Sequence, residues 1–192
     1  MSVPGHHHAQ HLAVYAGSFD PITLGHLDVL RRARRLFDGL ILGIGHNPDK
    51  PALFSFDERV EMAQSLVDEM LEAEPHGAPV RVERYSGLTV DFARANNACA
   101  LVRGIRNITD LASECQIAIA NRQVADIETV FVVTGEAFAF TSSSLIRQIA
   151  GLGGELNRLS GIIPPIVIDR LNRLRADPRN PLGRLVKDHS IE

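Results

Sequence analysis

The chain of 192 residues is poor in the features that mark several classes of protein. It has no tryptophan, two cysteines and two lysines, and no apolar run approaches the ~18 residues of a membrane-spanning helix. Cys99 and Cys115 form no CxxC pair and no zinc pattern, so we expect free thiols in a reducing, cytoplasmic compartment. The net charge of −3 and the pI of about 6.2 predict neither nucleic-acid nor membrane partners.

Two common nucleotide-binding motifs are also missing. The chain has no G-x-G-x-x-G, which disfavours a dinucleotide-dependent oxidoreductase, and no G-x-x-x-x-G-K-[ST], which disfavours a P-loop NTPase. With 45% hydrophobic and 22% charged residues, the composition is otherwise that of a globular protein with one sizeable core.

The sequence does contain a repeated alternation of short apolar runs and longer amphipathic stretches. The runs that predict strands cover residues 12–16, 40–44, 80–85, 98–102 and 129–133. The stretches that predict helices cover residues 23–37, 55–71, 89–95, 110–124, 143–150 and 165–175. Five successive strand–helix units predict an α/β protein with a doubly wound, five-stranded parallel sheet.

Local signals mark the ends of several predicted helices. Thr23 is expected to cap the first helix, and Gly39 is read as a stop after it. Ser55 and Glu58 form an S-x-x-E capping box at the start of the second helix. Asp110 is expected to cap the fourth.

Both ends of the chain differ in composition from its middle. Residues 1–11 contain four histidines, but no acidic or cysteine partner lies nearby, so we favour a flexible leader over a metal site. Residues 176–192 are polar and contain two prolines, so they are expected to form a tail. One domain is therefore expected over residues 12–175.

Polar residues collect where the predicted strands end. The carboxyl ends of parallel strands meet at one edge of the sheet, and ligands bind there. In this acidic chain the same edge gathers His26, Lys50, Arg103 and Arg106, which predicts a phosphate site. The five segments at this edge are GSFDPITLGH (17–26), GHNPDK (45–50), SGLT (86–89), RGIR (103–106) and TGEAFAFTSSS (134–144).

The first of these segments is the most informative. Gly25 lets a phosphate approach the backbone closely, and His26 lies in the first turn of a helix, where free N–H groups favour an anion. The alternative is that Thr23 is only a cap and His26 only a surface residue. We favour the functional interpretation because G-S-F-D-P directly precedes this turn at the end of an apolar strand.

The cations of the later segments support the same interpretation. The chain has 18 arginines but only two lysines, and one of these is Lys50. A lysine kept at this position indicates a need for a compact ammonium group there. The planar guanidinium groups of Arg103 and Arg106 suit phosphate, and their alternative is ion pairing with Asp110 or Glu114.

The fifth segment leads into a helix through a threonine and three serines. Hydroxyls there usually cap the helix, but the same N–H groups can also hold a nucleotide phosphate, and three serines exceed what capping needs. Arg147 follows one turn later and either reaches the same phosphate or is solvated.

Five motifs, in this order, resemble those of bacterial phosphopantetheine adenylyltransferases of the nucleotidyltransferase superfamily. They are AGSFDPITLGH (16–26), NPDK (47–50), RGIR (103–106), ECQIAxxNR (114–122) and TSSSLIR (141–147), and the resemblance covers about residues 12–175. It implies a Rossmann-like nucleotidyltransferase fold. It also implies that the 4′-phosphate of phosphopantetheine attacks the α-phosphorus of ATP, giving dephospho-CoA and pyrophosphate in coenzyme A biosynthesis. Mg²⁺ accompanying ATP and a homohexamer built as a dimer of trimers are further implications.

The resemblance also assigns roles to residues. It makes His26 the catalytic residue that stabilises the transition state, and it implies no metal-ligating residue. On the acceptor side it places Ser18, Lys50, Thr89 and Arg103. Around ATP it places Ser18, Phe19, His26, Gly104, Ile105, Arg106, Glu114, Phe138, Ala139, Phe140, Thr141, Ser142, Ser143 and Ser144.

This chemistry needs no general base. A phosphate monoester has a second pKa near ~6, so at pH 7 it is mostly a dianion and already a nucleophile. Two alternatives stay open. One is another adenylyl- or cytidylyltransferase, such as a nicotinamide mononucleotide adenylyltransferase, and the other is a non-catalytic nucleotide-binding module on the same fold.

Overall fold

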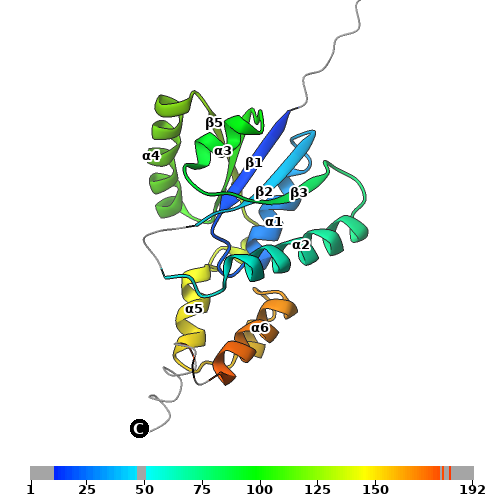
Figure 1. The fold of residues 1–192 in the computed structure, drawn as a ribbon, viewed down its shortest axis with the longest axis vertical. Helices are drawn as coiled ribbons and strands as arrows, with labels where there is room; N and C mark the ends of the chain where they lie inside the picture. Colours follow the sequence, from blue (N-terminus) through cyan, green and yellow to red (C-terminus); the bar gives the residue numbers. More distant parts are fainter. Residues whose placement is uncertain (1–10, 47–50, 178, 180–181, 183–192) are drawn as a thin grey trace, which may run out of the picture.

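The structure, a computed structural model, describes residues 11–46, 51–177, 179 and 182. Its centre is a five-stranded parallel sheet with the strand order β3-β2-β1-β4-β5 (Figure 1). The α/β fold with a doubly wound parallel sheet is therefore confirmed. The strands are β1 (Leu12–Gly17), β2 (Gly39–Ile44), β3 (Val80–Arg84), β4 (Ala100–Ile105) and β5 (Glu128–Val133).

Helices cover both faces of the sheet. They are α1 (Leu24–Ala33), α2 (Phe56–Ala73), α3 (Thr89–Ala95), α4 (Ile108–Ala125), α5 (Ser143–Gly151) and α6 (Pro165–Ala176), with short 3-10 helices at Glu136–Phe138 and Leu156–Leu159. The ribbon shows α1 and α2 on one side, α3 and α4 on the other, and α5 and α6 beyond the carboxyl ends of the strands (Figure 1). None of the helices in the described part of the chain is long and apolar enough to cross a membrane.

Alternate residues of β1 point to opposite faces of the sheet, so they belong to two separate apolar clusters. Ala13 and Tyr15 belong to a large apolar cluster that also contains buried residues of α1, α2, α5 and α6. Val14 and Ala16 point to the opposite face, where they pack in a smaller cluster with α3. Because β1 is buried on both faces, its sequence is a continuous apolar run.

The order in which strands are added to the sheet reverses at β1. After β1 the chain builds β2 and β3 on one side, and it then returns to build β4 and β5 on the other. The crevice between the carboxyl ends of β1 and β4 is thus the switch point at which ligands bind in open parallel sheets.

Several predicted boundaries were wrong. The first helix ends at Ala33 rather than at residue 37. Gly39 begins β2 rather than ending a helix, and a Cβ there would lie 3.1 Å from the side chain of Leu12. β4 continues to Ile105 because its pairing with β5 extends that far, so Arg103 lies inside the strand. Asn107, not Asp110, caps α4, and its side chain accepts a bond from the Asp110 N–H.

The buried position of Leu30 gives a test of this core. Leu30 in α1 is 0% exposed, so Leu30→Ala should lower the free energy of unfolding by about 2–5 kcal/mol in urea. The matched control is Leu36→Ala, because Leu36 is 60% exposed and its loss should change stability by no more than about 0.5 kcal/mol. Equal losses in the two variants would contradict the packing described here.

Candidate active site

A cavity of about 340 Å³ lies at the carboxyl ends of β1 and β4. The loop after β1 and the first turns of α1 and α5 form much of its wall. Its lining residues are Tyr15, Ala16, Gly17, Ser18, Phe19, Thr23, Gly25, His26, Val29, Arg103, Gly104, Arg106, Glu114, Thr134, Thr141, Ser142, Ser143 and Ser144.

The cavity brings together most of the residues singled out in the sequence. Those that line it are Ser18, Phe19, His26, Arg103, Gly104, Arg106, Glu114, Thr141, Ser142, Ser143 and Ser144. Those that do not line it are Thr89, Ile105, Phe138, Ala139 and Phe140. Lys50 lies outside the described residues.

His26 is held by the cap of α1. The Thr23 N–H donates to the His26 Nδ1 at 3.0 Å, and the Thr23 hydroxyl accepts from the His26 backbone N–H at 3.3 Å. The ring also meets Phe19 edge to face, with the centroids 5.1 Å apart. Because Nδ1 accepts a backbone hydrogen bond, the neutral ring carries its proton on Nε2.

The surroundings of His26 keep this ring neutral in the free protein. Burial lowers the pKa of His26 to about 4, and the charges of Arg106 and Arg103 act in the same direction. At pH 7 the side chain is therefore a neutral hydrogen-bond donor. A bound phosphate would oppose the effect of the two arginines.

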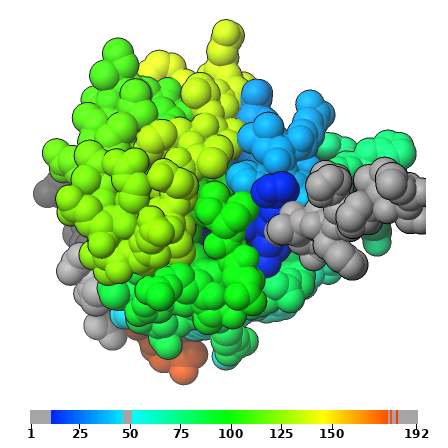
Figure 2. Space-filling view, turned by 90° about the horizontal axis from the view of Figure 1, so that it is seen from above, coloured from blue at the N-terminus to red at the C-terminus, as the bar shows by residue number. Residues whose placement is uncertain are grey.

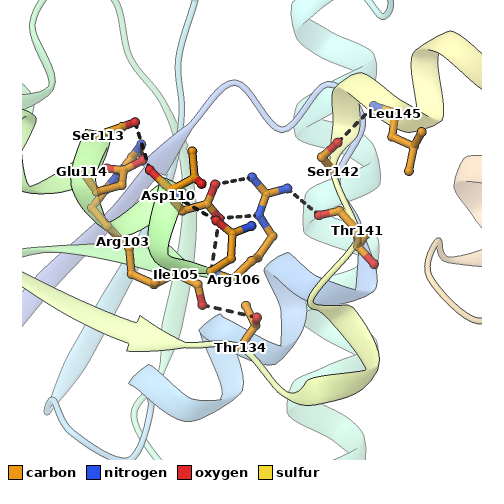
Figure 3. A network of polar contacts seen from close by, with 12 residues as sticks. Arg103, Ile105, Arg106, Asp110, Ser113, Glu114, Thr134, Thr141, Ser142 and Leu145 are labelled. Carbon is orange, nitrogen blue, oxygen red and sulfur yellow. Dashed lines mark hydrogen bonds and ion pairs between the residues drawn. The ribbon is translucent and has the colours of Figure 1, made fainter.

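Arg103 is oriented by a carboxylate. Its guanidinium donates two bonds to Glu114, which lies beside it in Figure 3, at 2.6 and 2.7 Å. A third bond goes to the Ala16 carbonyl at 2.9 Å. These bonds use three of its five N–H donors, so two are left for a ligand. The ion pair with Glu114, which the sequence analysis gave as the alternative to phosphate binding, is therefore present. Arg103 also faces the cavity.

Arg106 has a comparable arrangement. It donates to the Asp110 carboxylate at 2.7 and 3.0 Å and to the Thr141 carbonyl at 2.6 Å (Figure 3). It therefore joins the start of α4 to the turn that leads into α5. These contacts fix Arg106 at the cavity, and they leave two of its N–H donors for a ligand.

The serines that lead into α5 have different partners. Ser142 is the cap, since its hydroxyl accepts from the Leu145 N–H at 3.0 Å. Ser143 donates to the Pro21 carbonyl at 2.8 Å and so fastens α5 to the loop after β1.

The first turns of α1 and α5 thus both reach the same cavity. In α1 the N–H groups of Leu24 and His26 already donate to the Ile162 carbonyl and the Thr23 hydroxyl, so Gly25 supplies the N–H available to an anion there. In α5 the available N–H groups are those of Ser143 and Ser144.

Three charged residues near the site were missed by the sequence analysis. Asp20, 5% exposed, accepts from backbone N–H groups of the loop after β2, and Arg59, 3% exposed, donates to the carbonyls of Ser18 and Gly45. Asp28 accepts from the Gly135 N–H at 2.7 Å. Their partners are distant in sequence, so no spacing indicates these contacts.

Arg147 is not simply a solvated cation and does not line the cavity, whereas its contact with a nucleotide phosphate stays a prediction. Its guanidinium donates to Asp20 at 2.9 Å and to the Pro51 carbonyl at 2.5 Å.

Comparison with solved structures identifies the fold. A nicotinate-nucleotide adenylyltransferase described as putative, from Vibrio parahaemolyticus, superposes with a TM-score of 0.54 at 15% identity, covering 87% of this chain and 94% of that one. A bifunctional NMN adenylyltransferase/ADP ribose pyrophosphatase from Francisella tularensis gives a TM-score of 0.64 at 16% identity, over 95% of this chain and 54% of that one. At these identities the likeness concerns the fold alone.

Sequence comparisons are more specific. Residues 14–149 match the cytidylyltransferase-like family. The phosphopantetheine adenylyltransferase of Rhodopirellula baltica is 47% identical over 87% of this chain and 90% of its own length. The enzyme of the same name from Geobacter metallireducens is 40% identical over 88% of this chain and 98% of its own. The chain therefore belongs to the cytidylyltransferase-like family and, within it, to the phosphopantetheine adenylyltransferases.

Proposed function

We propose that the protein transfers the adenylyl group of ATP to 4′-phosphopantetheine, releasing pyrophosphate and forming dephospho-CoA. The observation that carries this proposal is the convergence of two helix N-termini, His26 and two oriented arginines on one cavity. Such a cavity suits a reaction in which two phosphate groups must meet. The relatives that are 40–47% identical to this chain are named phosphopantetheine adenylyltransferase, after this reaction.

The chemical step is a displacement at the α-phosphorus. An oxygen of the acceptor phosphate forms the new P–O bond, the bond to the β-phosphate bridging oxygen breaks, and pyrophosphate leaves with that electron pair. The acceptor is mostly a dianion at pH 7, so no proton has to be removed from it. The protein has to hold the two anions in line and stabilise the charge of the transition state.

His26 is proposed to stabilise that charge as a neutral donor. Its Nδ1 is occupied by the Thr23 N–H, which leaves Nε2–H to donate to an α-phosphate oxygen. The N–H groups of the first turn of α1 add their positive potential to the same region.

The remaining proposed roles are divided between the two substrates, and some of these residues lie outside the cavity lining described above. For the acceptor side we propose Ser18, Lys50, Thr89 and Arg103. For ATP we propose Ser18, Phe19, His26, Gly104, Ile105, Arg106, Glu114, Phe138, Ala139, Phe140, Thr141, Ser142, Ser143 and Ser144. The positions of Arg106 and of the first turn of α5 support the ATP side, since both offer donors to the cavity.

We infer that Mg²⁺ accompanies ATP. Glu114, a carboxylate on the cavity wall, is bonded twice to Arg103, and residues 11–46 and 51–177 contain no cluster of three His, Cys, Asp or Glu side chains arranged to hold a metal. This donor set fits an ion held mainly by substrate phosphates and water, as Mg²⁺ commonly is. When bound, the ion would neutralise part of the triphosphate charge.

We further propose that the chain assembles into a homohexamer, a dimer of trimers, as the resemblance implies, and the exposed surface of α4 supports contact between copies of the chain. This 18-residue helix has no buried residue in the single chain, and Ile108, Ile119 and Val124 are between 50% and 85% exposed. Seen from above, α4 and β5 form one outer flank of the molecule (Figure 2). A second copy covering this apolar flank would remove it from water.

Analytical ultracentrifugation tests the assembly. We expect a species of about six times 21.0 kDa, and Ile119→Asp should shift it to smaller species because a charge would enter the interface. The control is Leu152→Asp, since Leu152 is comparably exposed but lies at the end of α5. A wild-type monomer would contradict the proposed assembly.

Release of pyrophosphate tests the proposed function. The protein is incubated with ATP and Mg²⁺, and with phosphopantetheine, nicotinamide mononucleotide or no acceptor. We expect pyrophosphate only with phosphopantetheine. Release only with the mononucleotide would indicate a different adenylyltransferase, and no release with either acceptor would indicate a non-catalytic module.

His26→Ala tests the assigned donor. Loss of one preorganised donor to the transition state should lower kcat at least ~100-fold, while the urea midpoint stays close to that of the wild type. His76→Ala, at an exposed histidine in the loop before β3, is the matched control and should keep full activity. A turnover near normal in His26→Ala would refute the role.

The protonation state of His26 can be measured by NMR with labelled histidine. In the free protein we expect an Nε2–H tautomer that titrates near pH 4, and ATP should raise that pKa. The unfolded chain binds this proton near pH 6.5, so His26 contributes stability that is present above pH 6.5 and lost as the pH falls toward 4. Titration near pH 6.5 in the free protein would contradict the burial argument.

A further inference from the structure

Tyr15, in β1, brings a hydroxyl group to the wall of the cavity. The residue is 5% exposed, and its ring meets Phe19 edge to face with the centroids 5.3 Å apart. No residue in the described part of the chain forms a hydrogen bond with this hydroxyl, and it is not one of the polar atoms that protein encloses on all sides. In Tyr85, the other tyrosine, the hydroxyl is 2.9 Å from the Thr89 hydroxyl. Because a buried tyrosine hydroxyl normally has a partner, the Tyr15 hydroxyl is left for a ligand in the cavity.

The hydroxyl lies beside Gly104 of β4. A Cβ added to Gly104 would lie 3.6 Å from the Tyr15 hydroxyl oxygen and 2.8 Å from the Val29 Cγ2. Gly104 and Val29 both line the cavity, so the hydroxyl and the bare backbone of Gly104 share one part of its wall. Val29 comes one turn after His26 in α1. This part of the cavity is therefore next to the second turn of α1, one turn away from the Gly25 N–H that is available to an anion.

Alternation along the strands places this hydroxyl on the side of the cavity proposed for ATP. Tyr15 is opposite Val102 in the pairing of β1 with β4, and both belong to the large apolar cluster. Arg103 points to the opposite face of the sheet, where Glu114 of α4 accepts from it. Gly104, the next residue, returns to the face of Tyr15. Gly104 is proposed for ATP and Arg103 for the acceptor, so the hydroxyl is expected near the nucleotide.

The hydroxyl is a neutral group in the free protein. Burial raises the pKa of Tyr15, and the opposing charges of Arg103 and Arg106 do not cancel this effect. At neutral pH the group therefore keeps its proton and can both donate and accept a hydrogen bond. Ionised phosphate oxygens only accept, and the arginines and helix N–H groups already supply donors for them. The hydroxyls of a ribose and the edge of an adenine base both donate and accept, so they match Tyr15 better.

We propose that the Tyr15 hydroxyl binds the nucleoside part of ATP by a hydrogen bond, which makes Tyr15 a specificity-determining residue for the nucleotide. This inference rests on the proposed function. In the free protein the hydroxyl bonds to no described residue, so its removal leaves the contacts of the fold in place. In the complex its removal takes away a bond to the nucleoside and leaves the contacts proposed for His26 and Arg106.

Calorimetric titration of Tyr15→Phe tests the proposal, because this change removes the hydroxyl and keeps the ring on Phe19. We expect the Kd for ATP with Mg²⁺ to rise about threefold to tenfold, as the loss of one hydrogen bond predicts. The Kd for inorganic tripolyphosphate with Mg²⁺ should not change, because this ligand has no nucleoside. The KM for phosphopantetheine should not change either.

Thr129→Val is the matched control. The Thr129 hydroxyl also lacks a partner in the described part of the chain, but it is enclosed in β5 and does not line the cavity. Both Kd values of this variant should equal those of the wild type.

The urea midpoint separates binding from a structural role. It should be the same in Tyr15→Phe and the wild type, and a lower midpoint in the variant would assign the hydroxyl to the fold and overturn the proposal. An unchanged Kd for ATP, or equal rises for ATP and tripolyphosphate, would also overturn it. A wild-type protein that binds ATP but releases no pyrophosphate with phosphopantetheine would instead overturn the proposed function, and the comparison of Kd values would still decide the role of Tyr15.

Discussion

The account depends on the repulsion between two phosphate groups that must come within bonding distance. Both reactants are anions, so the protein must gather positive charge and hydrogen-bond donors at one point before they arrive. A parallel sheet offers such a point at its switch, where the loops after β1 and β4 lie side by side. The free N–H groups of α1 and α5 converge there without the need for a lysine-rich surface, which explains how a chain of net charge −3 can bind polyanions.

The arginines at this point are held in place before any ligand binds. Glu114 orients Arg103, and Asp110 orients Arg106, so neither guanidinium is free to swing into solvent. Part-buried ion pairs contribute little net stability because desolvation offsets their attraction. Their value here lies in orientation, since each arginine keeps donors available in a fixed geometry. The neutral His26 fits the same scheme, because a charged imidazole beside two arginines would be disfavoured.

Local patterns in the sequence predicted much of this arrangement, and tertiary contacts determined the rest. The apolar run of β1 and the T-L-G-H turn lie close together in sequence, so the strand, the cap at Thr23 and the place of His26 followed from spacing. Asn107 and Asp110 are both residue types that cap helices, so the sequence does not decide between them for α4. In the structure the Asp110 carboxylate accepts from Arg106, and Asn107 is the cap. The contact between Asp20 and Arg147 spans 127 residues, so no local pattern indicates it.

The central claim is that the acceptor phosphate attacks the α-phosphorus directly, with no protein nucleophile between them. The stereochemistry at that phosphorus is the most direct test. With ATP made chiral by sulfur at the α-phosphorus, a single in-line displacement predicts inversion of configuration in the dephospho-CoA analogue. Retention of configuration would require two displacements through a covalent enzyme intermediate and would contradict the account.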